Sequence, residues 1–388
     1  MIDNTYSEAT ANQIGTYCFR KIINNVLYQY MKVIVLTDHF GQGGAERVAS
    51  LIVNGLSVIE GNEVHVCVFE DLNNYNTKVD RVTFHVLADE TKGHLVNAWL
   101  KIRNLARVIK DTGADVIFSF GPIMAGYVYM AKKLSGCANL KVIDSERNDP
   151  RFEPVQNWKK HFRNFCYNRA DILVCQTPMA VDLLRNMYGV TTQTEIIPNP
   201  ITPNLPVWKG VQSKTIITAC RLTEQKNLLL LIDAFQLLHR DHPDYSLIIY
   251  GDGEQREMLS NYINAKHLSD NVTLPGFAKN IHDIMSNAYM YVSSSDYEGI
   301  SNSMLEALGI GLPCVCTDCP VGGAAMYIKN GASGILTKVG DVEGLYLGMK
   351  RLIENPSLAS DMSNASRRIN DELSLPKITG KWVNIVKS

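Results

Sequence analysis

The chain alternates short apolar runs with longer amphipathic ones. Residues 32–38 (KVIVLTD) and 63–69 (EVHVCVF) are continuous apolar runs, and residues 44–61 between them carry apolar side chains at helical spacing. Continuous runs of this length are typical of strands buried on both faces. Strand–helix–strand patterns predict an α/β fold, in which a mostly parallel sheet has helices on both faces.

The same alternation occurs on both sides of a proline-rich segment. Residues 95–113 are expected to form a helix that ends at Gly113, and residues 195–210 contain four prolines and read as a linker and hinge. The other expected strands are residues 115–120, 141–145, 171–177, 214–220, 246–251, 271–276, 288–294, 313–318 and 333–341. The other expected helices are residues 227–241, 254–266, the region around 304–309, and 376–388.

A chain of 388 residues is too long for one hydrophobic core, so two doubly wound domains that face across a cleft are expected. The predicted domains are residues 31–205 and 206–372, followed by a C-terminal helix over 373–388. Residues 1–30 are expected to be a loosely ordered extension, because MKVIVL at Met31 resembles the natural start of the first strand.

The composition indicates a soluble folded protein, with 46% hydrophobic and 20% charged residues. No apolar run reaches the roughly 20 residues that span a bilayer, and the polar N-terminus does not resemble a signal peptide. A cytoplasmic location is therefore expected. The nine cysteines are scattered, and the alternation in residues 314–319 (CVCTDC) favours a strand with reduced thiols over a metal site.

Positive charge is concentrated in one part of the chain. Residues 92–170 contain 14 Lys and Arg but 6 Asp and Glu, which favours an anionic partner, either a phosphate compound or a membrane surface. Within this part, residues 155–169 contain four basic residues, no acid, and the aromatic residues Trp158, Phe162, Phe165 and Tyr167. Such a helix suits an anionic inner-membrane surface, or it is an ordinary helix with aromatics in the core. No nucleic-acid-binding module accompanies the basic residues, so no nucleic-acid partner is expected.

Two glutamates flank a glycine-containing loop in residues 294–311 (SSDYEGISNSMLEALGIG). Backbone N–H groups at such a helix start can hold a phosphate. Glu306 can accept hydrogen bonds from a ribose diol, and Glu298 can accept them from sugar hydroxyls. Alternatively, Ser303 and Glu306 form a capping box that only starts a helix.

Two further loops after expected strands have the composition of a phosphate site. Arg221 and Lys226 stand in one loop and can neutralise a diphosphate and stabilise it as a leaving group. Gly251 and Gly253 stand in a turn that allows the backbone to approach a ligand closely. The alternatives are solvated loop charges and an ordinary tight turn.

Taken together, these motifs resemble retaining glycosyltransferases of family 4, which have the two-domain GT-B fold. The resemblance runs from Met31 to the C-terminus, with six motifs in the order of the family. They are residues 41–47 (GQGGAER), the R-x4-K loop, residues 251–254 (GDGE), residues 274–277 (LPGF), the E-x7-E element and residues 330–341 (NGASGILTKVGD).

The resemblance implies a role for each matching residue. Arg221 and Lys226 would bind the diphosphate, Glu306 the ribose and Glu298 the transferred sugar. The phosphate would also meet the loop of Gly299, Ile300 and Ser301. Phe277 would line the base pocket, Gly43 and Gly44 would approach the donor from the N-terminal domain, and residues 373–388 would cross back to that domain.

The implied reaction moves a hexose or N-acetylhexosamine from a nucleoside-diphosphate sugar, expected to be a UDP-sugar, to a lipid-linked or saccharide acceptor. The implied process is bacterial surface polysaccharide or glycolipid synthesis, such as capsule or O-antigen, at the cytoplasmic face of the inner membrane. The sequence contains no D-x-D, so neither a metal nor another cofactor is expected. Alternatives are a GT-B nucleotide-sugar epimerase and a non-catalytic sugar-nucleotide-binding subunit.

The chain departs from the family at one strand end. Many relatives have a histidine where this chain has Ser119-Phe120-Gly121. His39, Arg147 and Asn148 are candidates to position the acceptor or the donor phosphate, although Asn-Asp-Pro at 148–150 also favours an ordinary turn.

Dinucleotide binding is an alternative role for the glycine loop at 41–46. Glu46 stands where the third glycine of that fingerprint belongs, although Glu70 is placed where a ribose-binding acid would lie. The second half of the chain offers no dehydrogenase chemistry, which argues against this reading.

Overall fold

The computed structural model describes residues 30–40, 43–69, 82–88, 93–210 and 212–388. The expected extension at 1–30, apart from Tyr30, therefore lies outside the described residues, as do Gly41, Gln42 and Glu70. The chain divides into two compact units. Unit 1 comprises the described residues up to Cys175, Val181–Pro200 and Leu375–Ser388, and unit 2 comprises Gln176–Ala180 and Ile201–Ser374.

Unit 1 is built on a seven-stranded parallel sheet with the order β3-β2-β1-β4-β5-β6-β7. The order reverses between β1 and β4, as in doubly wound nucleotide-binding folds. The strands are β1 (Lys32–Thr37), β2 (Glu63–Val68), β3 (Val82–Val86), β4 (Val116–Phe120), β5 (Lys141–Glu146), β6 (Ile172–Cys175) and β7 (Thr194–Ile196).

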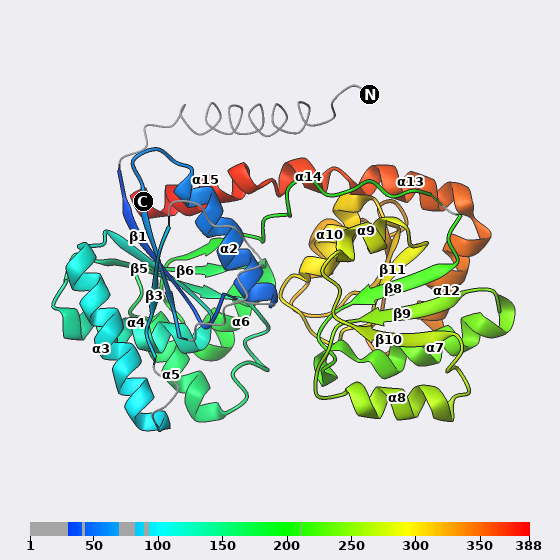
Figure 1. Cartoon of the computed structure of the whole chain (residues 1–388), viewed down its shortest axis with the longest axis horizontal. Helices are drawn as coiled ribbons and strands as arrows, with labels where there is room; N and C mark the ends of the chain where they lie inside the picture. The colour runs from blue at the N-terminus through cyan, green and yellow to red at the C-terminus, as the bar shows by residue number, and fades with distance from the viewer. Residues whose placement is uncertain (1–29, 41–42, 70–81, 89–92, 211) are drawn as a thin grey trace, which may run out of the picture. The chain divides into compact units, whose positions relative to one another are not determined.

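The two faces of this sheet are covered by different helices. Ile34 and Leu36 of β1 share a core cluster with residues of α3 and α4, whereas Phe118 of β4 packs edge-on against Trp382 of α15 at 5.1 Å between ring centroids. Helix α15 also lies beside α2 (Figure 1). The helices are α2 (Gly44–Ser57), α3 (His94–Thr112), α4 (Pro122–Ser135), α5 (Asn157–Tyr167), α6 (Pro178–Tyr188) and α15 (Leu375–Lys387).

Unit 2 is built on a six-stranded parallel sheet with the order β10-β9-β8-β11-β12-β13. Its order reverses between β8 and β11, the same topology as unit 1. The strands are β8 (Thr215–Ala219), β9 (Ser246–Tyr250), β10 (Val272–Gly276), β11 (Met290–Ser293), β12 (Cys314–Thr317) and β13 (Ile335–Thr337).

Helices α7 and α12 cover one face of the unit-2 sheet, and Phe235 and Met349 are fully buried in the resulting core with Val315 of β12. Helix α10 packs on β11, β12 and α9. The helical segments are η1 (Glu224–Lys226), α7 (Leu228–Asp241), α8 (Arg256–Ala265), α9 (Ile281–Ser286), α10 (Asn302–Ile310), α11 (Gly323–Tyr327), α12 (Val342–Glu354), α13 (Pro356–Ser366) and α14 (Ile369–Glu372).

The two parallel α/β sheets confirm the predicted fold class. Within the proline-rich segment, unit 1 ends at Pro200 and unit 2 begins at Ile201, whereas residue 205 was the predicted boundary. Ile201 donates its backbone N–H to the carbonyl of Leu373 in unit 2. Gln176–Ala180 also group with unit 2, and α15 packs within unit 1. None of the helices in the described part of the chain combines the length and apolar character that a bilayer crossing requires.

Candidate active site

A small polar pocket lies at the point where the strand order of unit 2 reverses. In doubly wound sheets, ligands bind outside the carboxyl ends of the strands at this point. Thr218 of β8 and Ser293 of β11 line the pocket together with Cys220, Lys226 and Ser301. The pocket is therefore bounded by the two strand ends, one cation and the start of α10.

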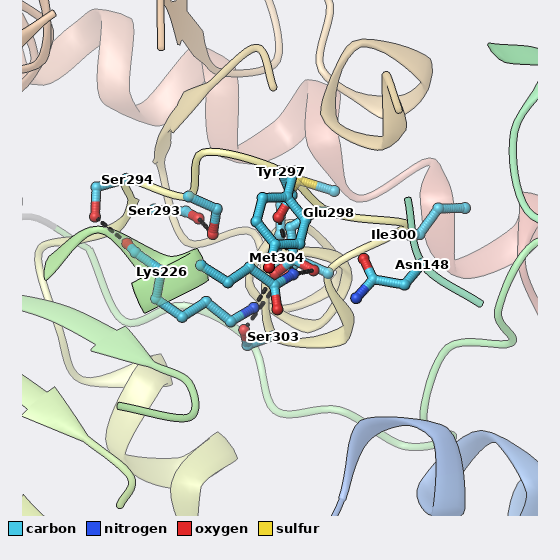
Figure 2. A network of polar contacts seen from close by, with 12 residues as sticks. Asn148, Lys226, Ser293, Ser294, Tyr297, Glu298, Ile300, Ser303 and Met304 are labelled. Carbon is cyan, nitrogen blue, oxygen red and sulfur yellow. Dashed lines mark hydrogen bonds and ion pairs between the residues drawn. The ribbon is translucent and has the colours of Figure 1, made fainter. Parts of the chain in front are cut away.

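Three hydrogen bonds join the loop after β8 to the loop after β11. The hydroxyl of Ser294 donates to the carbonyl of Lys226 at 2.8 Å (Figure 2). The side-chain amide of Asn227 donates to Asp296 at 2.8 Å. The backbone N–H of Asp296 donates to the carbonyl of Gln225 at 2.9 Å. Because the two loops are bonded along their length, they hold their side chains in a fixed relation.

The bonded loops bring together two of the predicted catalytic residues, Lys226 and Glu298. Lys226 forms an ion pair with Oε1 of Glu298 (Figure 2). The side-chain amide of Gln225 donates to Oε2 of Glu298 at 3.1 Å and to the carbonyl of Tyr297 at 2.9 Å. Burial disfavours the charge on Lys226, but attraction to Glu298 outweighs it and raises the pKa of Lys226 above its usual value. The site therefore holds a charged ammonium where a diphosphate would need one.

Arg221 stands in the same loop, with an exposed side chain. The predicted glycines of the next loop pack against this loop. A Cβ at Gly251 would lie 1.9 Å from the carbonyl oxygen of Cys220, and one at Gly253 would lie 2.4 Å from that of Leu222. Close backbone approach between two loops therefore requires both glycines, independently of any ligand.

The start of α10 differs from the predicted capping box. The N-cap is Ser301, whose hydroxyl accepts from the backbone N–H of Met304 at 3.4 Å. The capping-box alternative for Ser303 and Glu306 is wrong, because the helix begins earlier and Glu306 lies beyond its first turn. The backbone N–H of Ile300 donates to Oε1 of Gln176 at 3.1 Å, so this part of the predicted phosphate loop has a protein partner.

A second pair of glycines packs the loop before α10. A Cβ at Gly323 would lie 2.0 Å from the carbonyl oxygen of Gly299. The loop that contains Glu298 therefore rests directly on the backbone at the start of α11. Phe277, the predicted base-pocket residue, directly follows β10 and is 57% exposed.

Glu306 is buried and has two protein partners from different segments. Nε2 of His282 lies 3.0 Å from Oε2 of Glu306, and the hydroxyl of Thr202 donates to Oε1 at 3.0 Å. His282 belongs to α9, and Thr202 stands at the start of unit 2. Neither His282 nor Thr202 is among the site residues predicted from the sequence, because no motif links positions so far apart.

In unit 1, Gly43 is the N-cap of α2 and Gly44 is the first residue of that helix. Nδ1 of His39 lies 3.5 Å from a carboxylate oxygen of Glu46. These residues follow the end of β1, where the order of the unit-1 sheet reverses. Their position matches the edge at which doubly wound sheets bind ligands.

The other unit-1 candidates belong to a hydrogen-bonded loop after β5. Arg147 donates from its guanidinium to Asn199 and, at 3.3 Å, to Ser145. The backbone N–H groups of Arg147 and Asn148 donate to Oε1 of Glu146 at 3.0 and 3.3 Å. Burial raises the pKa of Glu146 to about 7. The loop is thus built around a buried carboxyl group.

Helix α5 is anchored to this loop by a buried arginine. Arg163 lies 3.5 Å from Glu146 and donates to the carbonyls of Pro150 and Glu153 at 3.0 and 2.7 Å. Tyr167 is also fully buried. Arg163 and Tyr167 therefore belong to the core of unit 1, as in an ordinary helix, whereas Trp158, Phe162 and Phe165 are exposed.

The strand end that lacks the family histidine contains a buried polar pair. The hydroxyl of Ser119 on β4 donates to Oδ1 of Asp144 on β5 at 2.5 Å, and both side chains are buried. Burial raises the pKa of Asp144 to about 7. Asp144 is not among the site residues predicted from the sequence, although an acid within an apolar strand could have indicated a special role.

Cys314 and Cys316 are buried on β12, as the alternating pattern suggested. Among the described residues, no three His, Cys, Asp or Glu side chains are grouped in a way that could hold a metal ion. Metal-independent catalysis stays a prediction.

Comparison with known proteins gives two family matches in consecutive parts of the chain. The model for Glycosyltransferase Family 4 matches residues 42–205, and the model for glycosyl transferases group 1 matches residues 208–369. The chain is 29% identical over 355 residues to an uncharacterized glycosyltransferase of Haemophilus influenzae, covering 89% of this chain and 96% of that protein.

A second relative has a named activity. The chain is 25% identical over 351 residues to the N-acetylgalactosamine-N,N'-diacetylbacillosaminyl-diphospho-undecaprenol 4-alpha-N-acetylgalactosaminyltransferase of Campylobacter jejuni, covering 87% of this chain and 94% of that protein. The solved structure of Anabaena HepE in complex with UDP and glucose has a TM-score of 0.80 at 17% identity, over 92% of this chain and 99% of that one. This likeness shows the shared fold. From the two family matches and the two sheets, the chain belongs to the glycosyltransferases of family 4 and group 1, with a GT-B fold.

Proposed function

We propose that the chain is a retaining, metal-independent transferase that moves a hexose or N-acetylhexosamine from a UDP-sugar to a lipid-linked or saccharide acceptor. The proposed process is surface polysaccharide or glycolipid synthesis. The observation that carries the proposal is the pocket at the ends of β8 and β11, which is lined by Lys226 and by Ser301 at the start of α10, with Glu298 ion-paired to Lys226. A cation and a helix start suit a diphosphate, and a carboxylate suits sugar hydroxyls.

The proposed reaction begins when the bond between the anomeric carbon and the phosphate oxygen breaks. Lys226 and Arg221 offset the charge that develops on the departing diphosphate. An acceptor hydroxyl then forms the new bond on the same face of the sugar and gives its proton to the leaving phosphate, so no side-chain base is required. The alpha linkage named for the Campylobacter jejuni relative supports retention, because common UDP-sugars are themselves alpha-linked.

The acceptor is proposed to reach the enzyme at an anionic membrane surface, with the protein peripheral on the cytoplasmic face of the inner membrane. The Campylobacter jejuni relative is named for a diphospho-undecaprenol substrate, which is a membrane lipid. On α5, Trp158 is 67% exposed with Lys159 over its ring, and Phe165 is 41% exposed with Arg169 over its ring. Exposed aromatics with basic neighbours suit the headgroup region.

The test is a panel of UDP- and GDP-sugars, in which release of the free nucleotide by the purified protein is measured with and without lipid-linked acceptors. We expect one UDP-sugar to be cleaved slowly by water and faster with acceptor. A change in the sugar without nucleotide release would favour an epimerase. Nucleotide binding with no turnover of any donor would favour a non-catalytic binding subunit.

The Glu298→Ala variant links this activity to the pocket. It should lose nearly all donor cleavage while it retains nucleotide binding, because Glu298 is proposed to contact the sugar. Glu343→Ala is the matched control, since this exposed acid lies on α12 in the same unit. Normal donor cleavage by Glu298→Ala would show that the residue has been assigned wrongly.

A further inference from the structure

The carboxylate of Glu306 is held by two donors that come from separate segments of unit 2. His282 on α9 approaches Oε2 at 3.0 Å, and Thr202 donates to Oε1 at 3.0 Å. The Glu306 side chain is 7% exposed and that of His282 is 23% exposed. Each oxygen of the carboxylate therefore has one identified protein partner.

This arrangement fixes the orientation of the carboxylate. An ionised carboxylate can accept about four hydrogen bonds, two on each oxygen. With His282 at one oxygen and Thr202 at the other, the plane of the Glu306 carboxylate is fixed by protein donors. Two adjacent acceptors in a fixed plane match the two adjacent hydroxyls of a ribose.

Fixing the plane in advance also lowers the cost of binding. A glutamate side chain loses roughly 1.5–2 kcal/mol of rotamer entropy when it becomes ordered. If protein donors already impose that order, the ligand does not have to do so.

We propose that His282 and Thr202 are positioning residues that hold Glu306 for the 2′- and 3′-hydroxyls of the nucleotide and so set the preference for ribonucleotides over 2′-deoxynucleotides. This inference rests on the proposed function, in which Glu306 receives the ribose. It adds two residues that contact the carboxylate and not the ligand. Their effect should appear in nucleotide discrimination and not in folding.

The experiment measures dissociation constants of UDP and 2′-deoxy-UDP by calorimetry, or of the GDP pair if the wild-type protein binds GDP more tightly. A hydrogen bond to a charged group implies that the wild type prefers the ribonucleotide by roughly tenfold or more. We expect His282→Ala and Thr202→Val to reduce this ratio several-fold. His282→Gln should restore most of it, because its amide can still donate to Glu306.

A matched control separates positioning from folding. His242 lies 3.9 Å from Glu354 in the same unit, and its side chain is also 23% exposed, so His242→Ala removes a comparable His–Glu pair elsewhere. This control should leave the nucleotide ratio unchanged. Melting temperatures of all variants identify any that are merely unfolded, and Thr202→Ser provides a conservative second variant at the other contact.

The possible failures are distinguishable. If Glu306→Ala lowers the ribose preference but both His282→Ala and Thr202→Val keep it, the positioning inference is wrong and the role of Glu306 stands. If Glu306→Ala also keeps the wild-type ratio, or the wild type binds neither diphosphate, the ribose role fails and this inference fails with it. Tighter ribonucleotide binding by His282→Ala would show that His282 competes with the ligand, and would likewise overturn the inference.

Discussion

Lys226 and Glu298 form an ion pair that joins the loop after β8 to the loop after β11. One side chain is the proposed stabiliser of the leaving diphosphate, and the other is the proposed contact of the sugar. The pair places opposite charges side by side, with Lys226 lining the pocket at the ends of β8 and β11. A sugar diphosphate has the complementary arrangement, with an anion next to a group of neutral hydroxyl donors.

Replacing Lys226 should therefore affect catalysis more than stability. We expect Lys226→Ala to reduce kcat for donor cleavage by about 10²-fold or more, the usual cost of removing a charge-stabilising donor from a transition state. Lys266→Ala is the matched control, because Lys266, the C-cap residue of α8, forms a 2.7 Å pair with Asp233 of α7 in the same unit. Steady-state kinetics of both variants test the expectation, and equal losses of kcat would contradict it.

Gln225 should hold the carboxylate of Glu298 in position through its second oxygen, Oε2. Removal of its amide in Gln225→Ala frees Oε2 of Glu298 and the carbonyl of Tyr297, so the carboxylate can rotate. We expect kcat to fall about tenfold or more, since a hydrogen bond to a charged group contributes roughly 1.5–3 kcal/mol. Parallel measurement of nucleotide affinity should show little change, and a variant whose only defect is weaker nucleotide binding would speak against this role.

Gly251 offers a test of the packing between the two loops. It has φ +122°, and a Cβ there would collide with the carbonyl oxygen of Cys220, so Gly251→Ala should lower the free energy of unfolding by about 2 kcal/mol or more. Gly331→Ala is the control, because Gly331 has φ +79° but no atom within 4 Å of the added Cβ. Urea unfolding of both variants separates the collision from the backbone strain, and similar losses in the two would rule out the collision as the cause.

Asp144 should make the stability of unit 1 depend on pH. Burial raises the pKa of Asp144 to about 7, so the folded chain binds a proton that the unfolded chain releases near pH 4. The stabilising effect is complete below the unfolded pKa and is lost as the pH rises towards 7, with a slope of up to about 1.4 kcal/mol per pH unit. Asp144→Asn should therefore become more stable relative to wild type as the pH rises from 4 to 7.

The control for this titration is Asp111→Asn, because Asp111 is exposed on α3 in the same unit. Its effect on the free energy of unfolding should not change across that pH range. A constant difference between Asp144→Asn and wild type would mean that Asp144 does not titrate in this interval.

The proposed membrane surface of α5 predicts selective vesicle binding. The protein should sediment with vesicles that contain phosphatidylglycerol and much less with pure phosphatidylcholine vesicles. Lys159→Glu should weaken the anionic interaction by about tenfold or more, since each basic residue near such a surface contributes about 1 kcal/mol. Trp158→Ala should weaken binding to the anionic vesicles as well.

Leu347→Ser is the control for these variants, because this leucine is 51% exposed on α12 in unit 2. It should sediment like the wild type. Equal sedimentation of the wild type with both kinds of vesicle would remove the electrostatic basis of the proposal.

The sequence predicted the strands that line the core well, because long apolar runs such as that of β1 have few alternative structures. It missed β3, whose five residues are only partly buried and carry a weak alternation. It also placed the start of α10 too late, because Ser301 and Ser303 both suit an N-cap and only the backbone geometry selects Ser301.

Side-chain partners were harder to predict than elements. The proximity of Lys226 and Glu298 was expected from a family motif, but Gln225 is a neighbour whose orientation depends on the short helix η1. His282 and Glu306 are 24 positions apart on different helices, so only tertiary packing brings them together. The burial of Arg163 was not predicted, because a sequence does not reveal that four acceptors, from Glu146, Pro150, Glu153 and Asn164, surround its guanidinium.

The contact between Gly299 and Gly323 limits how this enzyme can diversify. Since a Cβ at position 323 would overlap the backbone carbonyl of Gly299, randomised libraries aimed at new donor sugars should return glycine at 323 in active clones. Substitutions that change the donor sugar should then occur at positions where a new side chain does not overlap neighbouring atoms. The packing of these two loops should therefore stay constant, and substrate preference should change through residues outside this contact.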